Sequence, residues 1–269
     1  HRRLIRRPVD RLSRTGPGGL AVGAPDRGRS PTQWTHRPRR CAGVRACPAA
    51  GLGAATYFGL PKLLQRLGLH APYKGRRFNL VGKRALVITT SHDTLGESGK
   101  ATGVAASELT WPYYEFLDAN MQVDVASIEG GEIPFEPMSL RWPVSMSADH
   151  RYLADPDLQQ KTRHSLKIDD LDFTQYDLVY MAGGWGAAYD LGYSEVLGEK
   201  ISEAHAEGIL LGSVCHGALG FLMATDVDGS PLVEGRTMTG VTDKQVEELG
   251  IGITPQHPET ELRRLGARL

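Results

Sequence analysis

Cysteine is scarce in this chain, with three in 269 residues: Cys41, Cys47 and Cys215. So few cysteines exclude a disulfide-rich scaffold of the small secreted type. Cys41 and Cys47 are separated by five residues, which is no usual zinc spacing, and no paired histidine follows nearby. Cys215 stands alone in the C-terminal part and has no disulfide partner there. The cysteine pattern therefore predicts a reducing, cytoplasmic compartment.

Long apolar runs are also missing. The sequence contains no stretch of about 18 apolar residues, the length that a membrane span needs, and no secretory leader with an apolar centre. We therefore expect no membrane span and no membrane partner. With 41% hydrophobic and 23% charged residues, the composition is that of an ordinary soluble protein.

Lysine is absent from the first fifty residues, which hold twelve Arg and two Asp, a net charge of +10. The remainder carries 19 basic and 29 acidic residues, a net charge of −10. Residues 1–50 are rich in Arg, Pro and Gly and are predicted to be a disordered tail, or translated sequence upstream of the true start. The alternatives are a basic arm for nucleic acid or acidic lipid and an organelle-targeting segment. We expect no nucleic-acid partner.

Residues 51–82 are predicted to form an amphipathic helix and a linker. Apolar residues at helical spacing mark the helix at 54–69, and residues 75–82 form the linker. We expect the helix to pack against the domain that follows; a membrane-surface role is the weaker alternative. The folded domain is predicted to be residues 83–269.

Apolar strands and helical patterns alternate through this domain, which predicts an α/β fold: a layered, mostly parallel sheet flanked by helices. Buried strands are predicted at 84–90, 123–128, 176–182 and 209–214, helices at 104–120, 149–165, 194–207 and 259–265, and a strand pair at 231–241. Such sheets bind ligands beyond the carboxyl ends of their strands. Loops 91–103, 183–186 and 215–217 are therefore expected to meet in one crevice.

Cys215 occupies a turn between an apolar strand and a helical stretch, with small residues on both sides. Such a turn exposes a nucleophile at the top of a parallel sheet, and the N-terminus of the following helix favours the thiolate. A buried structural thiol is the alternative, but Ser213 and Gly217 fit a turn of close backbone approach. We predict that Cys215 is a nucleophile and that the backbone N–H of His216 is an oxyanion donor.

Three other features can contribute to such a site. Gly183 and Gly184 end the third strand, and one of their N–H groups is predicted to complete the oxyanion hole; a plain tight turn is the alternative. Glu108 has small or apolar neighbours, which favour a protonated carboxyl able to exchange a proton with a substrate, although a surface charge is the common case. Asp243 by itself is typical of a helix N-cap.

At these residues the chain resembles the ThiJ/PfpI superfamily, a branch of the class I glutamine amidotransferase-like fold. The matching motifs are SEL at 107–109, AGGWGA at 182–187, VCHG at 214–217, LVEGR at 232–236 and VTDKQ at 241–245. The resemblance covers residues 83–269 and is greatest to the bacterial glyoxalase III and chaperone branch. It implies a flavodoxin-like layered sheet with a nucleophile elbow at Cys215.

The resemblance also implies roles for the candidate residues. In the family, the residue matching Glu108 contacts the nucleophile and transfers protons, and the residue matching Asp243 pairs with the histidine that follows the cysteine. Cys215, His216 and Asp243 are then a triad-like set, with oxyanion N–H groups at Gly184 and His216.

Two departures from the family pattern stand out. The zinc-binding histidine of the chaperone branch falls near Phe116, which cannot ligate a metal, so we expect no metal and no cofactor. Relatives continue into a further strand and helix beyond the segment that ends at Leu269, so we expect this domain to lack that pair and to expose a strand edge, which favours instability or association.

The implied activity is that of a cofactor-independent, glyoxalase III-like lyase of the D-lactate dehydratase type. Cys215 attacks a 2-oxoaldehyde such as methylglyoxal, Glu108 moves a proton between adjacent carbons, and a 2-hydroxy acid leaves. Two alternatives stay open: a Cys215-dependent amidase or peptidase, and a stress chaperone or redox sensor. The expected partners are a small carbonyl substrate, a second copy in a homodimer and unfolded-protein clients.

Overall fold

The computed structural model describes residues 75–142 and 144–269, all within the compact unit Ala55–Leu269. The predicted tail at 1–50 and the predicted helix at 54–69 lie outside the described residues. Residues 75–83 form no helix or strand. No helix of the described part is both long and apolar enough to cross a membrane.

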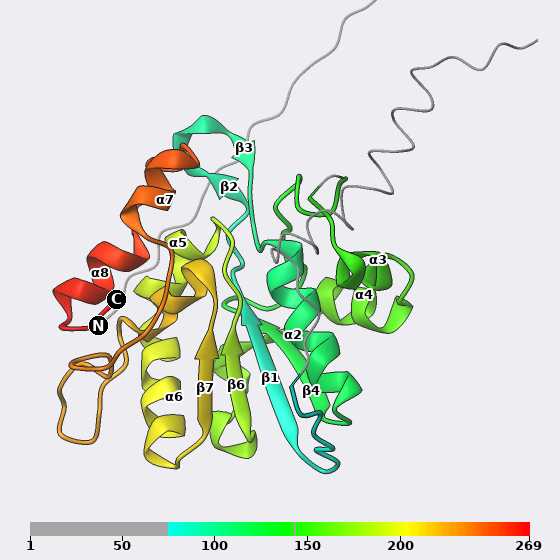
Figure 1. The fold of residues 1–269 in the computed structure, drawn as a ribbon, viewed down its shortest axis with the longest axis horizontal. Helices are drawn as coiled ribbons and strands as arrows, with labels where there is room; N and C mark the ends of the chain where they lie inside the picture. The colour runs from blue at the N-terminus through cyan, green and yellow to red at the C-terminus, as the bar shows by residue number, and fades with distance from the viewer. Residues whose placement is uncertain (1–74, 143) are drawn as a thin grey trace, which may run out of the picture. The chain divides into compact units, whose positions relative to one another are not determined.

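A five-stranded parallel sheet in the order β5-β4-β1-β6-β7 forms the centre of this unit (Figure 1). Its strands are β1 (Arg84–Thr89), β4 (Gln122–Ser127), β5 (Leu166–Lys167), β6 (Leu178–Met181) and β7 (Leu210–Ser213). A small antiparallel pair, β2 (Thr94–Leu95) and β3 (Lys100–Ala101), leaves the main sheet after β1. The prediction of a mostly parallel α/β sheet is confirmed.

The apolar strands are buried on both faces, because helices cover both sides of the sheet. In β1, Leu86 and Ile88 face one core, while Ala85 and Val87 face the other, and all four are fully buried. Helix α6 (Glu195–Ala206), the short α5 (Ala187–Asp190) and α8 (Pro258–Arg264) contribute to the first core. Helices α2 (Ala106–Asp118), α3 (Ser147–Leu153) and α4 (Pro156–Arg163) contribute to the second.

Proline has opposite effects in two predicted helices. Pro112 lies inside α2, which nevertheless runs without a break. Pro156 begins α4, and Asp155 caps that helix through its side chain, so residues 149–165 form two helices instead of the single predicted one. Short 3₁₀ helices complete the connections: η1 (Gly96–Ser98), η2 (Ile168–Asp170), η3 (Phe173–Gln175) and η4 (Leu191–Tyr193). Helix α7 (Asp243–Glu248) precedes α8.

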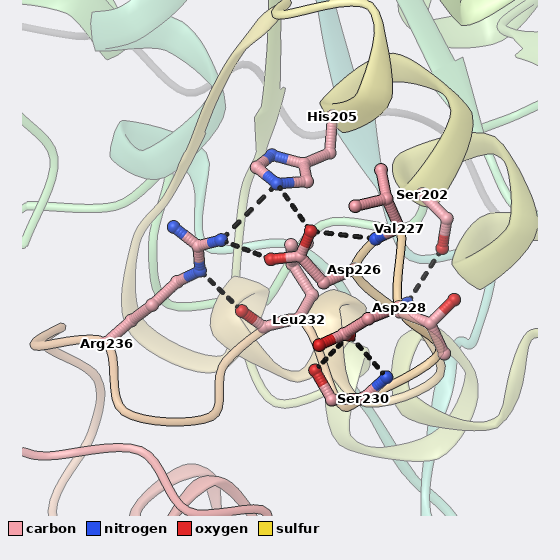
Figure 2. A network of polar contacts seen from close by, with 9 residues as sticks. Ser202, His205, Asp226, Val227, Asp228, Ser230, Leu232 and Arg236 are labelled. Atoms are coloured by element: carbon pink, nitrogen blue, oxygen red, sulfur yellow. Dashed lines mark hydrogen bonds and ion pairs between the residues drawn. The ribbon is translucent and has the colours of Figure 1, made fainter.

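The predicted strand pair at 231–241 is wrong. A side-chain network holds this region instead: Asp226 accepts a hydrogen bond of 2.7 Å from Arg236 Nη2 and lies 3.6 Å from His205 Nε2 on α6 (Figure 2). Beyond the network, Met238 N–H donates to the carbonyl of Arg268 at 3.0 Å. The segment thus pairs with the end of the chain and not with its own first half.

β7 is an edge strand that pairs only with β6 among the described residues. Leu210 on this strand is 64% exposed. A cavity of about 610 Å³ lies beside the edge, between β7 and residues 236–239. Neither Cys215 nor Glu108 lines this cavity, so it is separate from the candidate site.

Candidate active site

The backbone turns sharply at Cys215, as the sequence predicts. Val214 follows β7, and Cys215 has a φ of 55°, in the left-handed region that a non-glycine residue seldom adopts. A 3₁₀ helix, η5 (Cys215–Phe221), starts at this residue. Gly217 makes the turn possible, because a Cβ there would lie 2.2 Å from the carbonyl oxygen of Met181. The partly buried thiol therefore sits at the carboxyl end of β7.

Glu108 approaches the thiol from the opposite core, in the first turn of α2. Its Oε2 accepts a hydrogen bond of 3.0 Å from the backbone N–H of Gly183, and its carboxyl interacts with the thiol of Cys215. Burial raises the pKa of Glu108 to about 7, against the opposing effect of these two interactions. The carboxyl is therefore poised to take up or release a proton near neutral pH.

Gly183 and Gly184 let the backbone pass between the carboxyl and the thiol. A Cβ on Gly183 would lie 2.6 Å from Glu108 Oε2 and 2.7 Å from the backbone nitrogen of His216. Because the N–H of Gly183 is bound by Glu108, this residue positions the acid, and Gly184 is left as the candidate oxyanion donor of the two. The N–H groups of Gly184 and His216 instead act on the Cys215 sulfur.

The predicted lowering of the thiol pKa is wrong. Burial, together with the adjacent Glu108, raises the pKa of Cys215 to about 12, although the N–H groups of His216 and Gly184 oppose the rise. The 3₁₀ helix after the cysteine is only seven residues long, and its dipole does not outweigh burial. Deprotonation of the thiol thus depends on a neighbouring base, and Glu108 is the carboxyl that interacts with it.

His216 is completely buried beside the nucleophile. Its Nδ1 lies 3.4 Å from Cys215 Sγ, whereas its Nε2 has no hydrogen-bond partner among the described residues. Burial, with a smaller effect from the charge of His257, lowers the pKa of His216 to about 4. The imidazole is therefore neutral at physiological pH.

Asp243 is not brought to His216, so the triad-like set is not assembled in this structure. Asp243 is exposed at the start of α7, where its Oδ2 accepts a hydrogen bond of 2.7 Å from Thr260 and its N–H donates to Glu259. The residue stabilises the contact between α7 and α8. Its sequence context alone is typical of a helix N-cap, and this interpretation is closer to the observed role. Asp243 is the first residue of α7, and Thr242 supplies the cap itself.

Three residues near the thiol were not singled out from the sequence. Tyr180 of β6 lies near Glu108 and Cys215, and burial with these two groups raises its pKa, so it stays a neutral phenol. Trp185 packs with Cys215 against a small apolar cluster. His257 affects His216 from the N-terminus of α8. Only Trp185 had a signal, since it lies inside a matched motif.

The arrangement combines a nucleophile, a proton-exchanging carboxyl and two backbone donors. Among the described residues, no group of three or more His, Cys, Asp or Glu side chains is arranged to hold a metal ion. Phe116 packs edge-on against Tyr180, with ring centroids 6.0 Å apart. The chemistry that this set of residues supports is covalent attack by sulfur coupled to proton transfer.

The chain is similar in sequence to two fungal glyoxalases. The chain is 29% identical over 172 residues to the glutathione-independent glyoxalase HSP31 of Saccharomyces cerevisiae, covering 63% of this chain and 72% of that protein. Glyoxalase 3 of Candida albicans is 27% identical over 173 residues, with the same coverage of 63% and 72%.

Solved structures show the same fold. Rapid Encystment Protein 24 kDa of Francisella tularensis superposes with a TM-score of 0.65 at 32% identity, covering 69% of this chain and 82% of that one. The crystal structure of glyoxalase III from Candida albicans gives a TM-score of 0.64 at 24% identity over 69% and 81% of the two chains. The sequence profile of the DJ-1/PfpI family matches residues 100–254, more than half of the chain. The chain therefore belongs to the DJ-1/PfpI family.

Proposed function

We propose that this protein is a glutathione-independent glyoxalase that converts 2-oxoaldehydes such as methylglyoxal to 2-hydroxy acids, using Cys215 as nucleophile and Glu108 as proton carrier. The observation that carries the proposal is the position of Glu108 beside the cysteine turn, where its Oε2 accepts a hydrogen bond of 3.0 Å from Gly183 N–H and its carboxyl has a pKa of about 7. A group of that pKa accepts and returns protons efficiently at neutral pH. Relatives that carry the name glutathione-independent glyoxalase support the substrate class.

The reaction starts with sulfur attack on the aldehyde carbon. The Glu108 carboxylate takes the thiol proton as the carbon–sulfur bond forms, and the N–H groups of Gly184 and His216 stabilise the negative charge that develops on the oxygen. The proton then passes from Glu108 to that oxygen, giving a hemithioacetal and restoring the carboxylate.

Proton transfer between carbons follows. Glu108 removes the proton from the former aldehyde carbon, which gives an enediolate, and returns it to the adjacent carbon. The hydroxyl proton on the first carbon moves to the oxygen on the second, so that the first carbon becomes a carbonyl. The product is a thioester of the 2-hydroxy acid on Cys215. Water hydrolyses the thioester, so that the sum is one 2-oxoaldehyde and one water giving one 2-hydroxy acid, with no change of net oxidation state.

The amidase or peptidase alternative is less well supported by the geometry. Amide hydrolysis needs a general acid that protonates the leaving amine, as the histidine of a triad does. His216 has a pKa of about 4 and no carboxylate partner among the described residues, so it is a weak candidate for that role. Asp243 as a catalytic residue, homodimer assembly, client binding and a cytoplasmic location remain predictions.

Product analysis with the full chain tests the proposal. The protein is incubated with methylglyoxal in the absence of glutathione, and lactate is followed by NMR, alongside release of ammonia or peptide from amide substrates. We expect lactate from the wild type and none from Cys215→Ala. Amide hydrolysis without lactate formation would favour the amidase. Suppression of client aggregation that survives Cys215→Ala, without lactate formation, would favour the chaperone.

A further inference from the structure

The turn after β6 holds Trp185 between two glycines that pack tightly against the loop after β1. A Cβ on Gly184 would lie 2.4 Å from the carbonyl oxygen of Gly103, and a Cβ on Gly186 would lie 2.7 Å from that of His92. The N–H of Gly186 donates to the Gly103 carbonyl at 3.2 Å. The backbone on both sides of Trp185 is therefore fixed, so its side chain leaves a rigid part of the site.

Trp185 and Cys215 pack against the same small cluster of apolar side chains. Val241, Val246 and Ile251 form this cluster, and all three are buried. Val246 lies on α7, and α7 and α5 are placed beyond the carboxyl ends of β6 and β7 (Figure 1). The indole itself is only partly buried, so it keeps free surface next to the apolar cluster that the thiol also contacts.

The reacting atoms of the proposed reaction occupy the polar neighbours of the thiol. Glu108 exchanges the proton, and its Oε2 is held at 3.0 Å by the N–H of Gly183. The N–H groups of Gly184 and His216, which act on the sulfur, bind the oxygen of the attacked aldehyde. A 2-oxoaldehyde also carries a substituent on its second carbon, which takes no part in the chemistry. The apolar side of the thiol is left for that substituent.

We propose that Trp185 determines the substrate specificity of this site: its indole, together with the apolar cluster, binds the substituent of the 2-oxoaldehyde and favours longer alkyl substituents over the methyl group of methylglyoxal. The inference rests on the proposed function and adds a substrate class to it. Burial of apolar surface drives the preference, and a charged or hydroxylated substituent would lose its hydration against these side chains. Trp185 binds the substrate and transfers no proton.

Rates for a homologous series of substrates test this assignment. We measure kcat/KM of the full-length protein, without glutathione, for methylglyoxal, 2-oxobutanal, 2-oxopentanal and 2-oxohexanal, which differ by one methylene each. We expect kcat/KM of the wild type to rise about twofold to fourfold per methylene, since complete burial of a CH₂ group corresponds to about fourfold. The rise should come from KM, because a contact that is equally strong in the ground state and the transition state leaves kcat unchanged.

Variants at Trp185 assign the effect to the indole. Trp185→Ala should flatten the series to less than about 1.5-fold per methylene, because the apolar contact is lost, whereas Trp185→Phe keeps an aromatic surface and should retain most of the rise. Trp111→Ala is the matched control, since it makes the same change at a tryptophan that is 43% exposed on α2. If Trp185→Ala fails to fold, Trp185→Gln replaces it: this variant keeps a long side chain without the ring, and the same flat series is expected.

Alkylation of the Cys215 thiol gives a readout that does not depend on the proposed reaction. The sulfur of Cys215 displaces iodide from N-ethyl-, N-butyl- or N-hexyl-iodoacetamide while the thiol proton passes to a base. Mass spectrometry of the modified peptides distinguishes Cys215 from Cys41 and Cys47. We expect the rate constant at Cys215 to rise with alkyl length in the wild type and in Trp111→Ala, and to stay level in Trp185→Ala.

The two readouts separate failure of this inference from failure of the proposed function. A flat substrate series in a wild type that does form 2-hydroxy acids, or an equal rise in the wild type and Trp185→Ala, would overturn the role of Trp185 and leave the glyoxalase activity standing. A wild type that forms no 2-hydroxy acid, while longer reagents alkylate Cys215 faster only when Trp185 is present, would refute the proposed function and leave the apolar binding role of Trp185 standing.

Discussion

Glu108 lies in the first turn of α2, where two physical effects on its carboxyl oppose each other. The positive end of the helix and the N–H of Gly183 favour the carboxylate, and a helix terminus contributes about 0.3–1 kcal/mol. Burial favours the neutral acid, and it raises the pKa from 4.5 to about 7. That shift corresponds to about 3 kcal/mol, so desolvation outweighs the helix dipole.

The pH dependence of kcat/KM should report this carboxyl. Glu108 must be ionised to take the thiol proton, so kcat/KM for methylglyoxal is expected to be level above pH 7 and to fall about tenfold per pH unit below it. Steady-state rates between pH 4 and 9 measure this profile. An inflection near pH 4.5, the ordinary value for Glu, would show that the carboxyl is not the group that limits the reaction.

Residue types and spacing, together with the resemblance to the ThiJ/PfpI superfamily, pointed to Cys215, Glu108 and Gly184, and the structure places these residues around one turn. Asp243 was misplaced as a partner of His216, since nothing local distinguishes a carboxylate that faces the site from one that binds Thr260. His257 was missed because no local pattern in the sequence marks it as a residue near the site. It follows an irregular loop, and its charge acts on His216 only because α8 packs on η5.

At the scale of elements, the junction of β6 with the cysteine turn sets the distance between acid and nucleophile. Gly183 lies where the acid and the cysteine turn approach each other, because a Cβ there would overlap both Glu108 Oε2 and the backbone of His216. Backbone atoms cannot move aside as a flexible side chain does. The site therefore requires a residue without a Cβ at position 183.

Gly183→Ala is predicted to lower the free energy of unfolding by about 1–3 kcal/mol, the usual cost of overpacking, and to reduce methylglyoxal turnover strongly because Glu108 is displaced. Gly252→Ala is the control, since a Cβ on Gly252 meets nothing within 4 Å; it should change stability by less than about 0.5 kcal/mol. Denaturant unfolding and activity measure both. Full activity in Gly183→Ala would contradict the observed spacing.

Helices and strands could be predicted where their hydrogen-bond partners are near in sequence or where their side chains are completely buried. Continuous apolar stretches identified β1, β4, β6 and β7, because strands covered by helices on both faces need no alternation. The segment 231–241 was mispredicted, because Met238 pairs with Arg268, thirty positions away along the chain. A pattern within one segment cannot reveal a partner so distant.

For the molecule as a whole, the site residues have opposing effects on stability. The folded pKa of Glu108 is raised from 4.5 to about 7, so the folded state binds the extra proton and stability falls as pH rises through this interval. The folded pKa of His216 is lowered from 6.5 to about 4, so the unfolded state binds more protons and stability rises as pH goes from 4 to 6.5. The two effects largely cancel between pH 4.5 and 6.5.

Glu108→Gln should reveal this cancellation. The variant keeps the shape of the side chain without its titration, so it is expected to be more stable than the wild type above pH 7, by up to about 3 kcal/mol, and to have no such advantage below pH 4.5. Denaturant unfolding of both proteins between pH 4 and 8 measures the difference. Equal stability of the two proteins at pH 8 would mean that burial of the ionised Glu108 carboxylate does not destabilise the fold.

The rate of methylglyoxal conversion without glutathione, compared among four full-length proteins, tests the central claim most directly. The proteins are the wild type, Cys215→Ala, Glu108→Gln and the control Glu115→Gln, whose change is at an exposed position of the same helix. We predict lactate formation by the wild type and Glu115→Gln, a loss of at least about 10³-fold in Cys215→Ala and a loss of about 10²–10⁴-fold in Glu108→Gln. Full turnover by Cys215→Ala would contradict the account.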